Sequence, residues 1–446
     1  MNTLLLGKYD VPAPRYTSYP TVPYWDHAPT SVEWQAKAMQ LEEGISLYIH
    51  LPYCEHLCTY CGCNKRITKN HAVENPYIDS LLKEWSQYLS LWGQTPVIKE
   101  LHLGGGTPTF FSPAALERLV LGITKDAIVP KRASFSFEAH PSSTTIEHLQ
   151  TLRQLGFRRI SIGVQDFSPI ILEIINRQQS EVEVEMVTQS ARALGFDSIN
   201  YDLIFGLPLQ DKAAIRSTIE KVKRLRPDRI AFYSYAHVPW IKPSQRAYSE
   251  KDLPLGKDKR DLYDLGRTLL EEAGYLEIGM DHFALPSDEL YQAYQAGHLH
   301  RNFMGYTPHF TRLSIGLGAS AISDSWDAFV QNEKKVEDYQ TRVAQGGLPF
   351  FKGHLLTEED QIIRQHILNL MCRHETSWVD PSLQCDALFD GLERMDELEK
   401  DGLLERSAFT LKVTTEGLPF IRNICQALDA RLWEHQPEGL LFSQVV

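Results

Sequence analysis

Three cysteines within eight residues are the side chains of this sequence best suited to chemistry. Their spacing is Cys54-x-x-x-Cys58-x-x-Cys61, and they follow the apolar run Ile45–Leu51, which predicts a strand that enters a loop. Thiolates are good ligands for soft metal centres. Three thiolates on a four-iron cluster leave one iron without a protein ligand, and that iron can bind a small molecule. The spacing therefore favours a catalytic cluster over simple electron storage.

Two plainer uses of these thiols are a structural zinc site and simple burial. Zinc sites usually contain a second cysteine or histidine pair, whereas Cys372, Cys385 and Cys425 are scattered far downstream. Cys63 adds a fourth nearby sulfur, and spacing alone leaves it open as a ligand. The spacing resembles the signature of radical S-adenosylmethionine (SAM) enzymes, in which the open iron chelates SAM and the reduced cluster cleaves it to a 5′-deoxyadenosyl radical.

The composition is that of an ordinary globular protein. The 446 residues, 43% hydrophobic and 23% charged, suffice for one large domain and a smaller one. Four of the seven cysteines crowd into one loop, which indicates metal binding and not a disulfide framework. No signal peptide pattern and no apolar stretch near the roughly 20 residues of a membrane span are found. We therefore expect a cytoplasmic protein that needs no membrane partner.

The balance of charged residues indicates which classes of ligand the protein is suited to bind. Lys plus Arg total 45 against 57 Asp plus Glu, a formal net charge of −12. A chain this acidic is a poor candidate for nucleic-acid binding. An anionic small substrate stays compatible with it, because such a substrate needs only a few well-placed arginines.

Short β-rich runs alternate with amphipathic stretches over the first 280 residues. Strands are expected at Leu47–Leu51, Val97–Leu103, Ser134–Ala139, Arg159–Val164, Ser198–Phe205, Arg229–Tyr235 and Leu276–Met280. Helices are expected at Tyr77–Trp92, Pro113–Asp126, Thr145–Gly156, Val182–Gly195, Lys212–Arg226 and Lys257–Gly274. This alternation predicts an α/β fold with a parallel sheet and right-handed crossovers. An open or closed (β/α) barrel fits best, with a doubly wound sheet as the alternative.

The carboxyl ends of parallel strands form the functional edge in either fold. The cysteine loop, Gly104–Pro108, Glu138, Gln165 and Asp202 all fall there. An acid at the end of an apolar strand is costly to bury unpaired, so Glu138 and Asp202 must reach solvent or bind a cation or hydroxyl group. The glycine run lets the backbone approach a ligand closely, although a tight structural turn would look the same.

A second region begins near Pro349. Helices are expected at Thr357–Met371, Leu388–Gly402 and Gly417–Trp433, with a small hairpin at Leu403–Val413. This mostly helical module resembles a winged helix, and its mixed charge favours a lid over a DNA reader. We therefore divide the chain into an N-terminal arm (1–44), a catalytic barrel with its extension (45–348) and a C-terminal module (349–446).

Many ordered segments resemble one family, the oxygen-independent coproporphyrinogen III oxidases, which are radical SAM enzymes of haem biosynthesis. The resemblance covers nearly the whole chain. It rests on Pro14–Thr21, Cys54–Cys63, Gly104–Thr109, Gly163–Phe167, Asp202–Pro208, Gly279–Phe283, His300–Phe303, Gly305–Thr307 and Arg422–Cys425.

The family implies a fold and a reaction. The fold is a partial, TIM-like radical SAM barrel with the arm and the winged-helix-like module. The cofactors are a 4Fe-4S cluster and two molecules of SAM. Two propionates of coproporphyrinogen III are oxidatively decarboxylated to vinyl groups, which gives protoporphyrinogen IX, and a separate electron donor is needed. We expect a monomer.

The resemblance also implies roles for individual residues. The cluster ligands are Cys54, Cys58 and Cys61, with Cys63 as a fourth cysteine that does not ligate. The first SAM is contacted at Tyr48, Gly105 and Glu138, of which Tyr48 and Glu138 are also the catalytic candidates. The second SAM is contacted at Tyr60, Gly106, Thr107, Gln165, Arg177, Asp202, Ala236 and Ile322.

Two departures from the family concern the substrate. His140 stands where an aspartate is more usual, and Pro308–Arg312 replaces a more polar loop. They keep open a paralogue that acts on another tetrapyrrole, such as a haem ring-opening enzyme. A haem-binding chaperone is the other alternative, but such relatives have phenylalanine at the position of Cys63 and lack the N-terminal arm.

Coproporphyrinogen III carries four propionates, so a protein that binds it needs positively charged side chains at the binding site. Arg15 and Arg301 lie in segments shared with the family, so we expect them to anchor the substrate. The alternative is that both are structural arginines bonded to backbone carbonyls.

Overall fold

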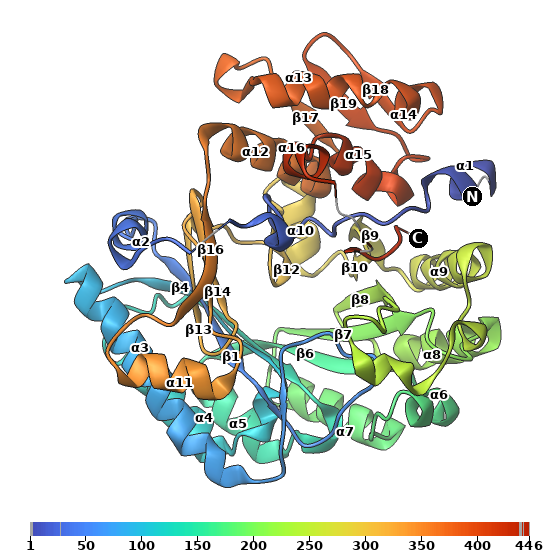
Figure 1. The fold of residues 1–446 in the computed structure, drawn as a ribbon. Coiled ribbons are helices and arrows are strands. Elements are labelled where there is room, and N and C mark those ends of the chain that lie inside the picture. The colour runs from blue at the N-terminus through green and yellow to red at the C-terminus, as the bar shows by residue number, and fades with distance from the viewer. Residues whose placement is uncertain (1–2, 27, 437–438, 440, 446) are drawn as a thin grey trace.

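The computed structural model describes residues 3–26, 28–436, 439 and 441–445. One twelve-stranded sheet, in the order β16-β15-β14-β13-β1-β4-β5-β6-β7-β8-β10-β9, organises the chain (Figure 1). Its centre is a run of six parallel strands in chain order. They are β1 (Ile45–Leu51), β4 (Ile98–Gly105), β5 (Ser134–Ala139), β6 (Phe157–Gln165), β7 (Ser198–Phe205) and β8 (Arg229–Ser234).

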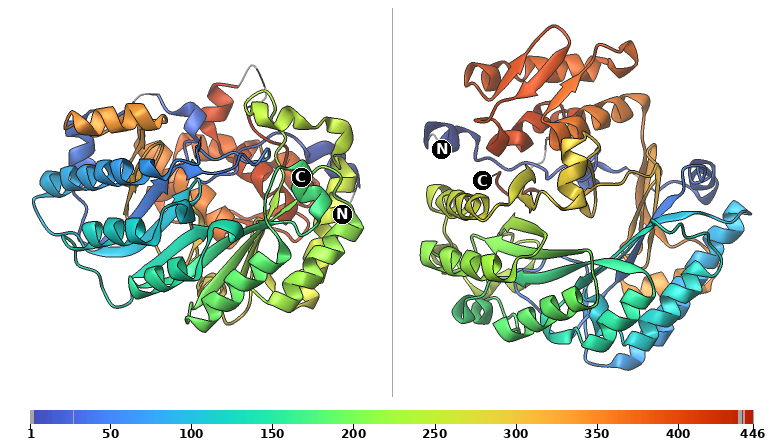
Figure 2. Two further views of the ribbon diagram at one scale, coloured as in Figure 1. Left: turned by 90° about the horizontal axis from the view of Figure 1, so that it is seen from below. Right: turned by 180° about the vertical axis from the view of Figure 1, so that it is seen from behind.

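The helices between these strands cover one face of the sheet, as the three views together show (Figures 1 and 2). They are α3 (Glu74–Trp92), α4 (Pro113–Thr124), α5 (Ile146–Gln154), α6 (Pro169–Ile174), α7 (Glu181–Ala193), α8 (Lys212–Leu225) and α9 (Gly256–Glu272). Local signals set their ends: Ser180 and Glu183 form a capping box at the start of α7, and Gly93 ends α3 with φ 61°. Because the helices lie on one face of an open, curved sheet, the partial barrel is confirmed and the doubly wound alternative is wrong.

The strands alternate strictly between two kinds of residue. Those that face the helices are apolar and fully buried, such as Leu101, Phe137 and Ile162. Those between them are mostly polar, and the register aligns His102, Ser136, Arg159 and Ser198 across four adjacent strands. Closed (β/α) barrels usually fill their interior with branched apolar side chains. Here the polar inner face instead borders a cavity.

The sheet continues at both edges with strands that the sequence did not predict correctly. Strand β13 (Leu313–Leu317) pairs parallel to β1, and β14 (Ile322–Asp324), β15 (Ala328–Asn332) and β16 (Phe350–Leu355) follow antiparallel. Helix α11 (Val336–Ala344) lies between β15 and β16 in the chain. At the other edge, the expected strand is β9 (Leu276–Gly279), but β10 (His282–Ala284) separates it from β8 and is antiparallel to both.

Residues 285–312 lie between the sheet and the C-terminal module (Figure 1). They contain α10 (Glu289–Gln295) and the hairpin of β11 (His300–Asn302) and β12 (Gly305–Thr307). The N-terminal arm, with α1 (Thr3–Tyr9), η1 (Val22–Tyr24) and α2 (Ser31–Lys37), runs between the same two bodies. Arg422 fixes the arm, because its guanidinium donates to the Pro14 carbonyl at 3.0 Å and to the Ala13 carbonyl.

The C-terminal module contains helices packed on a small sheet of three strands in the order β17-β19-β18. The expected hairpin is β18 (Leu404–Arg406) and β19 (Thr410–Val413), and β17 (Glu375–Ser377) was not anticipated. The first expected helix is α12 (Glu358–Arg373). The other two expected helices are each divided, into α13 (Asp386–Glu393) and α14 (Asp396–Lys400), and into α15 (Ile421–Ala427) and α16 (Ala430–Glu434).

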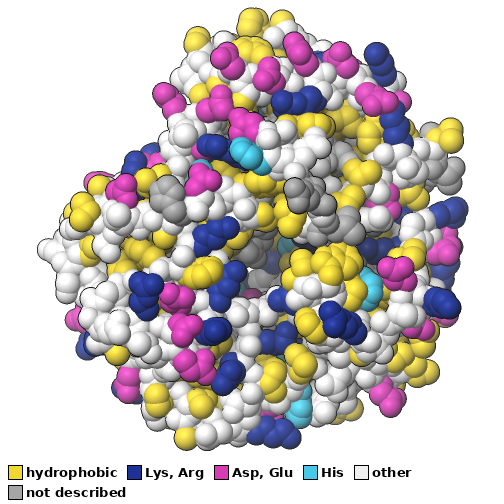
Figure 3. Space-filling view, viewed as in Figure 1, with side chains coloured by type: hydrophobic (Ala, Val, Ile, Leu, Met, Phe, Trp, Pro, Cys, Tyr) yellow, Lys and Arg dark blue, Asp and Glu magenta, His cyan; other side chains and the backbone are white. Residues whose placement is uncertain are grey.

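Side-chain capping explains one of these divisions. The Asp429 carboxylate accepts the Leu432 backbone N–H at 3.0 Å and the Tyr16 hydroxyl at 3.0 Å, so it starts a new helix and binds the arm. Within the described residues, no helix has the length and apolar character that crossing a membrane requires. On the face seen in Figure 3, Lys and Arg are interspersed with Asp and Glu.

Candidate active site

A cavity of about 460 Å³ lies on the inner face of the sheet. The cysteine loop, Gly105–Thr107, Glu138, Gln165 and Arg177 line it at the carboxyl ends of the strands. Farther down the same strands it is lined by Ser161, Asn200 and Asp202, and at their amino ends by Arg159 and Arg229. The cavity therefore runs along the strands instead of sitting only at their carboxyl ends.

The cysteine loop is held at both ends and along its backbone. Strand β2 (Tyr53–Cys54) pairs with β3 (Arg66–Ile67), which closes the loop. The Thr59 N–H donates to the Ile175 carbonyl at 3.0 Å, and the Asn176 side chain donates to the Leu57 carbonyl at 2.7 Å. The turn at 242–245 adds a hydrogen bond from Ser244 to the Thr59 carbonyl. These contacts fix the positions of the thiols before any ligand binds.

Cys54, Cys58 and Cys61 are free thiols that line the cavity and are partly exposed. Cys54 Sγ lies 3.3 Å from the Thr107 hydroxyl, and Arg177 Nη1 lies 3.7 Å from Cys58 Sγ. A hydrogen bond from Cys63 lowers the pKa of Cys61 to about 5, while burial raises the pKa of Cys54 to about 11.

This donor set fits a 4Fe-4S cluster. Three thiols on one short loop face a common space, and cationic Arg177 beside them favours thiolates. In the described part of the chain, no three His, Cys, Asp or Glu side chains converge on the position of a single metal ion. A four-iron cluster places its thiolates farther apart than one ion does, so it does not require that convergence.

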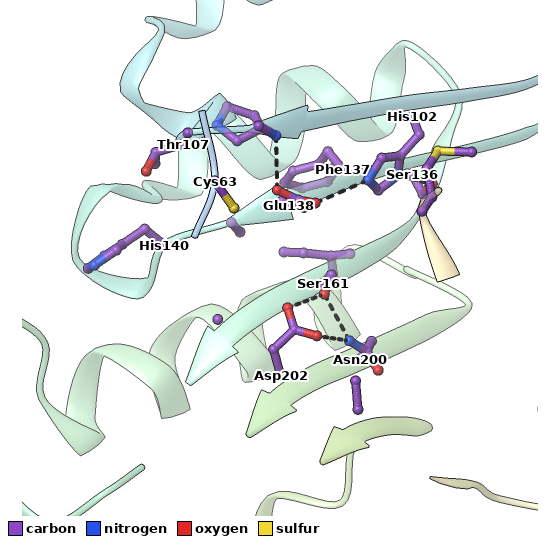
Figure 4. Close-up of a pocket in the computed structure, with 18 of the residues that line it drawn as sticks. Cys63, His102, Thr107, Ser136, Phe137, Glu138, His140, Ser161, Asn200 and Asp202 are labelled. Carbon is purple, nitrogen blue, oxygen red and sulfur yellow. Dashed lines mark hydrogen bonds and ion pairs between the residues drawn. The ribbon is translucent and has the colours of Figure 1, made fainter. Parts of the chain in front are cut away.

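The glycines after β4 make room beside the cluster loop. Gly105 has φ 119°, and a Cβ there would lie 2.8 Å from the His50 ring. A Cβ on Gly106 would lie 2.6 Å from the Pro52 carbonyl oxygen. The Gly105 N–H donates to Glu138 at 3.1 Å, and His102 Nε2 lies 3.5 Å from the other carboxylate oxygen, the pair seen in Figure 4. Glycine is therefore required at both positions because the backbone packs tightly against His50 and Pro52, and this packing holds the glycine run beside the cysteine loop.

Tyr48 does not line the cavity among the described residues, but it supports one that does. Its ring stacks on His102 with centroids 6.0 Å apart, and its hydroxyl lies 3.0 Å from His50 Nδ1. Burial and then the charge of Glu138 hold the pKa of Tyr48 well above its usual range. Tyr48 therefore lies beside His102, opposite it on the neighbouring strand and on the same face of the sheet.

Arg177, Tyr60 and Gln165 meet above the fourth parallel strand. Arg177 Nη1 donates to the Tyr60 hydroxyl at 3.2 Å, and its Nη2 donates to the Gly163 carbonyl. Gln165 has φ 66° at a register shift between β6 and β7. Such a bulge redirects a side chain at the end of a strand, and it turns Gln165 toward Gly163 and the cavity.

Asp202 is partly buried, and its hydrogen-bond partners are both neutral. Ser161 donates to one carboxylate oxygen at 2.9 Å and Asn200 to the other at 2.8 Å, which forms the triangle in Figure 4. Burial, and then the charge of Glu138, raises the pKa of Asp202 to about 6. A carboxylate of this kind is ready to accept hydrogen bonds from a ligand.

Besides Tyr48, four predicted residues lie outside the cavity lining among the described residues. Ala236 is tied by its carbonyl to Gln245, and Ile322 in β14 packs with a separate apolar cluster around Trp25. Arg15 pairs with Asp281 at 3.2 Å and donates to the Ser234 carbonyl. Arg301 donates to the Arg15 carbonyl at 3.2 Å and stacks over Tyr306. Each arginine thus donates to a backbone carbonyl, but Nε and Nη1 of Arg301 are buried without a partner among the described residues.

Sequence reasoning missed several cavity residues, chiefly Arg159, Asn200, Arg229, Tyr233 and His282. All but His282 lie on parallel strands that were predicted, and their side chains alternate with the buried apolar ones. That alternation, read as an inner and an outer face, was the signal that could have found them. His282 is partly buried, with Nε2 3.5 Å from the Tyr233 hydroxyl, and removal from water lowers its pKa to about 3.

Fold and site together define a radical SAM protein, and the model of the Radical SAM superfamily matches residues 48–222. The oxygen-independent coproporphyrinogen III oxidase of Salmonella typhimurium is 38% identical over 434 residues, covering 96% of this chain and 95% of that protein. The protein of that name from Escherichia coli K12 is 37% identical with the same coverage. The chain belongs to the family of oxygen-independent coproporphyrinogen III oxidases.

A solved structure gives the same answer for the fold. The coproporphyrinogen III oxidase from Escherichia coli, described as a radical SAM enzyme, matches with a TM-score of 0.91 and 35% identity. The match covers 96% of this chain and 98% of that one. The arm and the C-terminal module therefore belong to the shared fold along with the barrel.

Proposed function

We propose that this protein is an oxygen-independent coproporphyrinogen III dehydrogenase, which converts two propionates of coproporphyrinogen III to vinyl groups and forms protoporphyrinogen IX. The observation that carries the proposal is that the three thiols and both strand-end acids open onto one cavity, in a chain whose relatives match it from end to end. When bound, the reduced 4Fe-4S cluster and SAM supply a 5′-deoxyadenosyl radical, which abstracts a propionate β-hydrogen.

The residues of this chain hold and orient the reactants. Cys54, Cys58 and Cys61 bind the cluster, and Gly105 and Glu138 receive the first SAM at the end of β4 and β5. Tyr48 acts by supporting His102 beside Glu138. The second SAM lies against Tyr60, Gly106, Thr107, Gln165, Arg177 and Asp202, which face the cavity, with Ala236 and Ile322 near it by family analogy alone. The inner wall keeps the radical away from water.

The departures from the family fall in different places. None of residues Pro308–Arg312, all within the described part of the chain, lines the cavity, and Phe310 packs on His300 and Trp326 instead. His140 does line it, and burial lowers its pKa to about 2, so it is a neutral side chain there. The altered loop is therefore a weak reason to assign another tetrapyrrole.

We also propose the setting in which the enzyme works. It is a cytoplasmic monomer that takes electrons from a separate donor and binds neither nucleic acid nor membrane. Its three parts are the arm (1–44), the barrel with its extension (45–348) and the C-terminal module (349–446), which lies over the open side of the sheet.

Anaerobic turnover tests the function. Protein reconstituted with iron and sulfide, supplied with SAM, a chemical reductant, an electron acceptor and coproporphyrinogen III, is expected to form the divinyl product, with one carbon dioxide and one electron to the acceptor released for each vinyl group. A protein that cleaves SAM but leaves coproporphyrinogen III unchanged, while converting another tetrapyrrole, would establish the paralogue. Binding of haem without SAM cleavage would establish the chaperone.

A further inference from the structure

Arg159 and Arg229 line the floor of the cavity, at the end farthest from the cysteine loop. Arg159 lies near the start of β6 and Arg229 begins β8, with β7 between them. From Arg159 to Gln165 the strand covers six residues, which is about 20 Å at the usual rise of a β-strand. The floor is therefore a separate region from the cofactor residues above it.

Both guanidinium groups have unused hydrogen-bond donors. Arg159 Nη2 donates to the Ser136 hydroxyl at 3.3 Å, and Arg159 Nε is buried without a partner among the described residues. Arg229 Nε donates to Asp288 at 2.6 Å, and Arg229 Nη2 is likewise buried and unpartnered within the described chain. Those two nitrogens are shielded from the cavity. Arg159 Nη1 and Arg229 Nη1 likewise have no hydrogen-bond partner among the described residues, and they are not shielded in this way. A guanidinium offers five N–H donors, so these are the groups that an acceptor in the cavity can reach.

The two floor arginines are accompanied by the acids Asp288 and Glu100, and Glu289 is close enough to act on the pKa of Arg159. Asp288 is already engaged by Arg229, by the Ser198 hydroxyl at 2.7 Å and by the Leu290 N–H at 2.7 Å. Glu100, the other nearby acid on the cavity wall, accepts hydrogen bonds from Ser46 and Thr307. Burial, and then the neighbouring charge of Arg229, lowers the pKa of Arg159 to about 10. Two cations thus face the cavity against acids that have partners of their own.

We propose that Arg159 and Arg229 form a carboxylate-binding subsite, and that a propionate of the tetrapyrrole other than the reacting one occupies it. The inference rests on the proposed function. A guanidinium fork matches a carboxylate in geometry and charge. Propionates project from every pyrrole ring, so while one lies near the cluster another points down the cavity. Among the described residues Arg159 and Arg229 line the cavity, whereas Arg15 and Arg301 do not, so we assign to the floor pair the role that the sequence gave to Arg15 and Arg301.

The carboxylate of SAM is the other group that this subsite would bind, and the experiment distinguishes it from a propionate of the tetrapyrrole. Arg159→Gln removes the charge, and Arg158→Gln is the matched control, because Arg158 points to the other face, pairs with Asp197 at 3.0 Å and is half exposed. Reconstituted protein is titrated anaerobically with coproporphyrin III, a stable tetracarboxylate, with its neutral tetramethyl ester, and with SAM.

We expect Arg159→Gln to bind coproporphyrin III about 10- to 100-fold more weakly than wild type, whereas Arg158→Gln binds it normally. The tetramethyl ester should bind with the same affinity to wild type, Arg159→Gln and Arg158→Gln, and so should SAM. Arg159→Lys should recover part of the loss, and Arg229→Lys, which keeps a cation for Asp288, should weaken coproporphyrin III binding in the same sense.

Equal coproporphyrin III affinity in Arg159→Gln and Arg158→Gln would overturn the subsite, as would a loss confined to SAM. The subsite and the function fail separately. Wild type that forms vinyl products while Arg159→Gln keeps the same Michaelis constant refutes the subsite alone. Wild type that binds coproporphyrin III through Arg159 but never decarboxylates coproporphyrinogen III refutes the function alone.

Discussion

The two faces of the parallel sheet differ in what their side chains do. On the outer face Leu103 and Ile162 are fully buried under the helices and hold the fold together. On the inner face, one residue away, His102 and Gly163 border the cavity. Residues that stabilise the fold therefore alternate along each strand with residues that line the cavity. Substitutions on the outer face should lower the free energy of unfolding, whereas those on the inner face should lower ligand binding or activity.

The largest effect is expected at the top of the inner face. Cys58→Ser should lose the cluster and all SAM cleavage, because serine is a poor ligand for iron, while the fold survives. Iron content after anaerobic reconstitution, about four irons per chain in wild type, measures it. Cys63→Ser is the matched control and should keep a cluster that SAM still perturbs spectroscopically. If Cys63→Ser loses iron as completely as Cys58→Ser, the three-ligand assignment is wrong.

On the outer face the expected loss is one of stability. Leu103→Ala should lower the free energy of unfolding by about 2–5 kcal/mol, because it leaves a cavity in the core. Ser136→Ala, on the inner face of the neighbouring strand, removes hydrogen bonds to His102 and Arg159 and should cost about 1 kcal/mol. Chemical denaturation measures both values. Similar losses for the two variants would contradict the division between the faces.

Glu84, a buried acid in the helical layer that covers the outer face, is an exception among the apolar side chains there. Glu84 on α3 accepts hydrogen bonds from Tyr339, Asn332 and the Gly318 N–H, and burial raises its pKa to about 7. The folded state therefore binds this proton more tightly than the unfolded state does. Its contribution to stability is full below about pH 4.5 and is lost as the pH rises through 7, by about 3 kcal/mol in total.

Glu84→Gln should flatten that pH dependence. Denaturation of wild type and Glu84→Gln at several values between pH 5 and 8 measures the difference. Glu147→Gln, on the exposed side of α5, is the control and should follow wild type. Parallel stability curves for wild type and Glu84→Gln would show that Glu84 does not titrate in this range.

The smallest of these effects returns to the inner face. Glu138→Gln should weaken SAM binding by about 1.5–3 kcal/mol, or roughly 10- to 100-fold, because a charged acceptor becomes a neutral amide. The free energy of unfolding should change little, since the side chain is 41% exposed. Calorimetric titration with SAM measures the loss. Wild-type affinity in Glu138→Gln would remove this residue from the SAM site.

The features that could be predicted from the sequence are those with a local sequence pattern, and the features that were missed depend on contacts between distant segments. The cysteine loop, the glycine run and the acids at strand ends are local patterns, and the structure brings them to one cavity. Strands β13–β16 escaped prediction because their place in the sheet depends on pairing with distant segments, as β13 pairs with β1. The division between α15 and α16 escaped because it depends on Asp429 contacting the arm. The floor arginines need both the face and the register of three strands, which no local pattern provides.

One isotope measurement tests the central claim that the radical generated at the cysteine end acts on the substrate in this cavity. Coproporphyrinogen III deuterated at the propionate β-carbons is turned over anaerobically with unlabelled SAM, and the 5′-deoxyadenosine is analysed by mass spectrometry. We predict one deuterium in 5′-deoxyadenosine for each vinyl group formed. Vinyl formation with unlabelled 5′-deoxyadenosine, or SAM cleavage that coproporphyrinogen III does not affect, would contradict the claim.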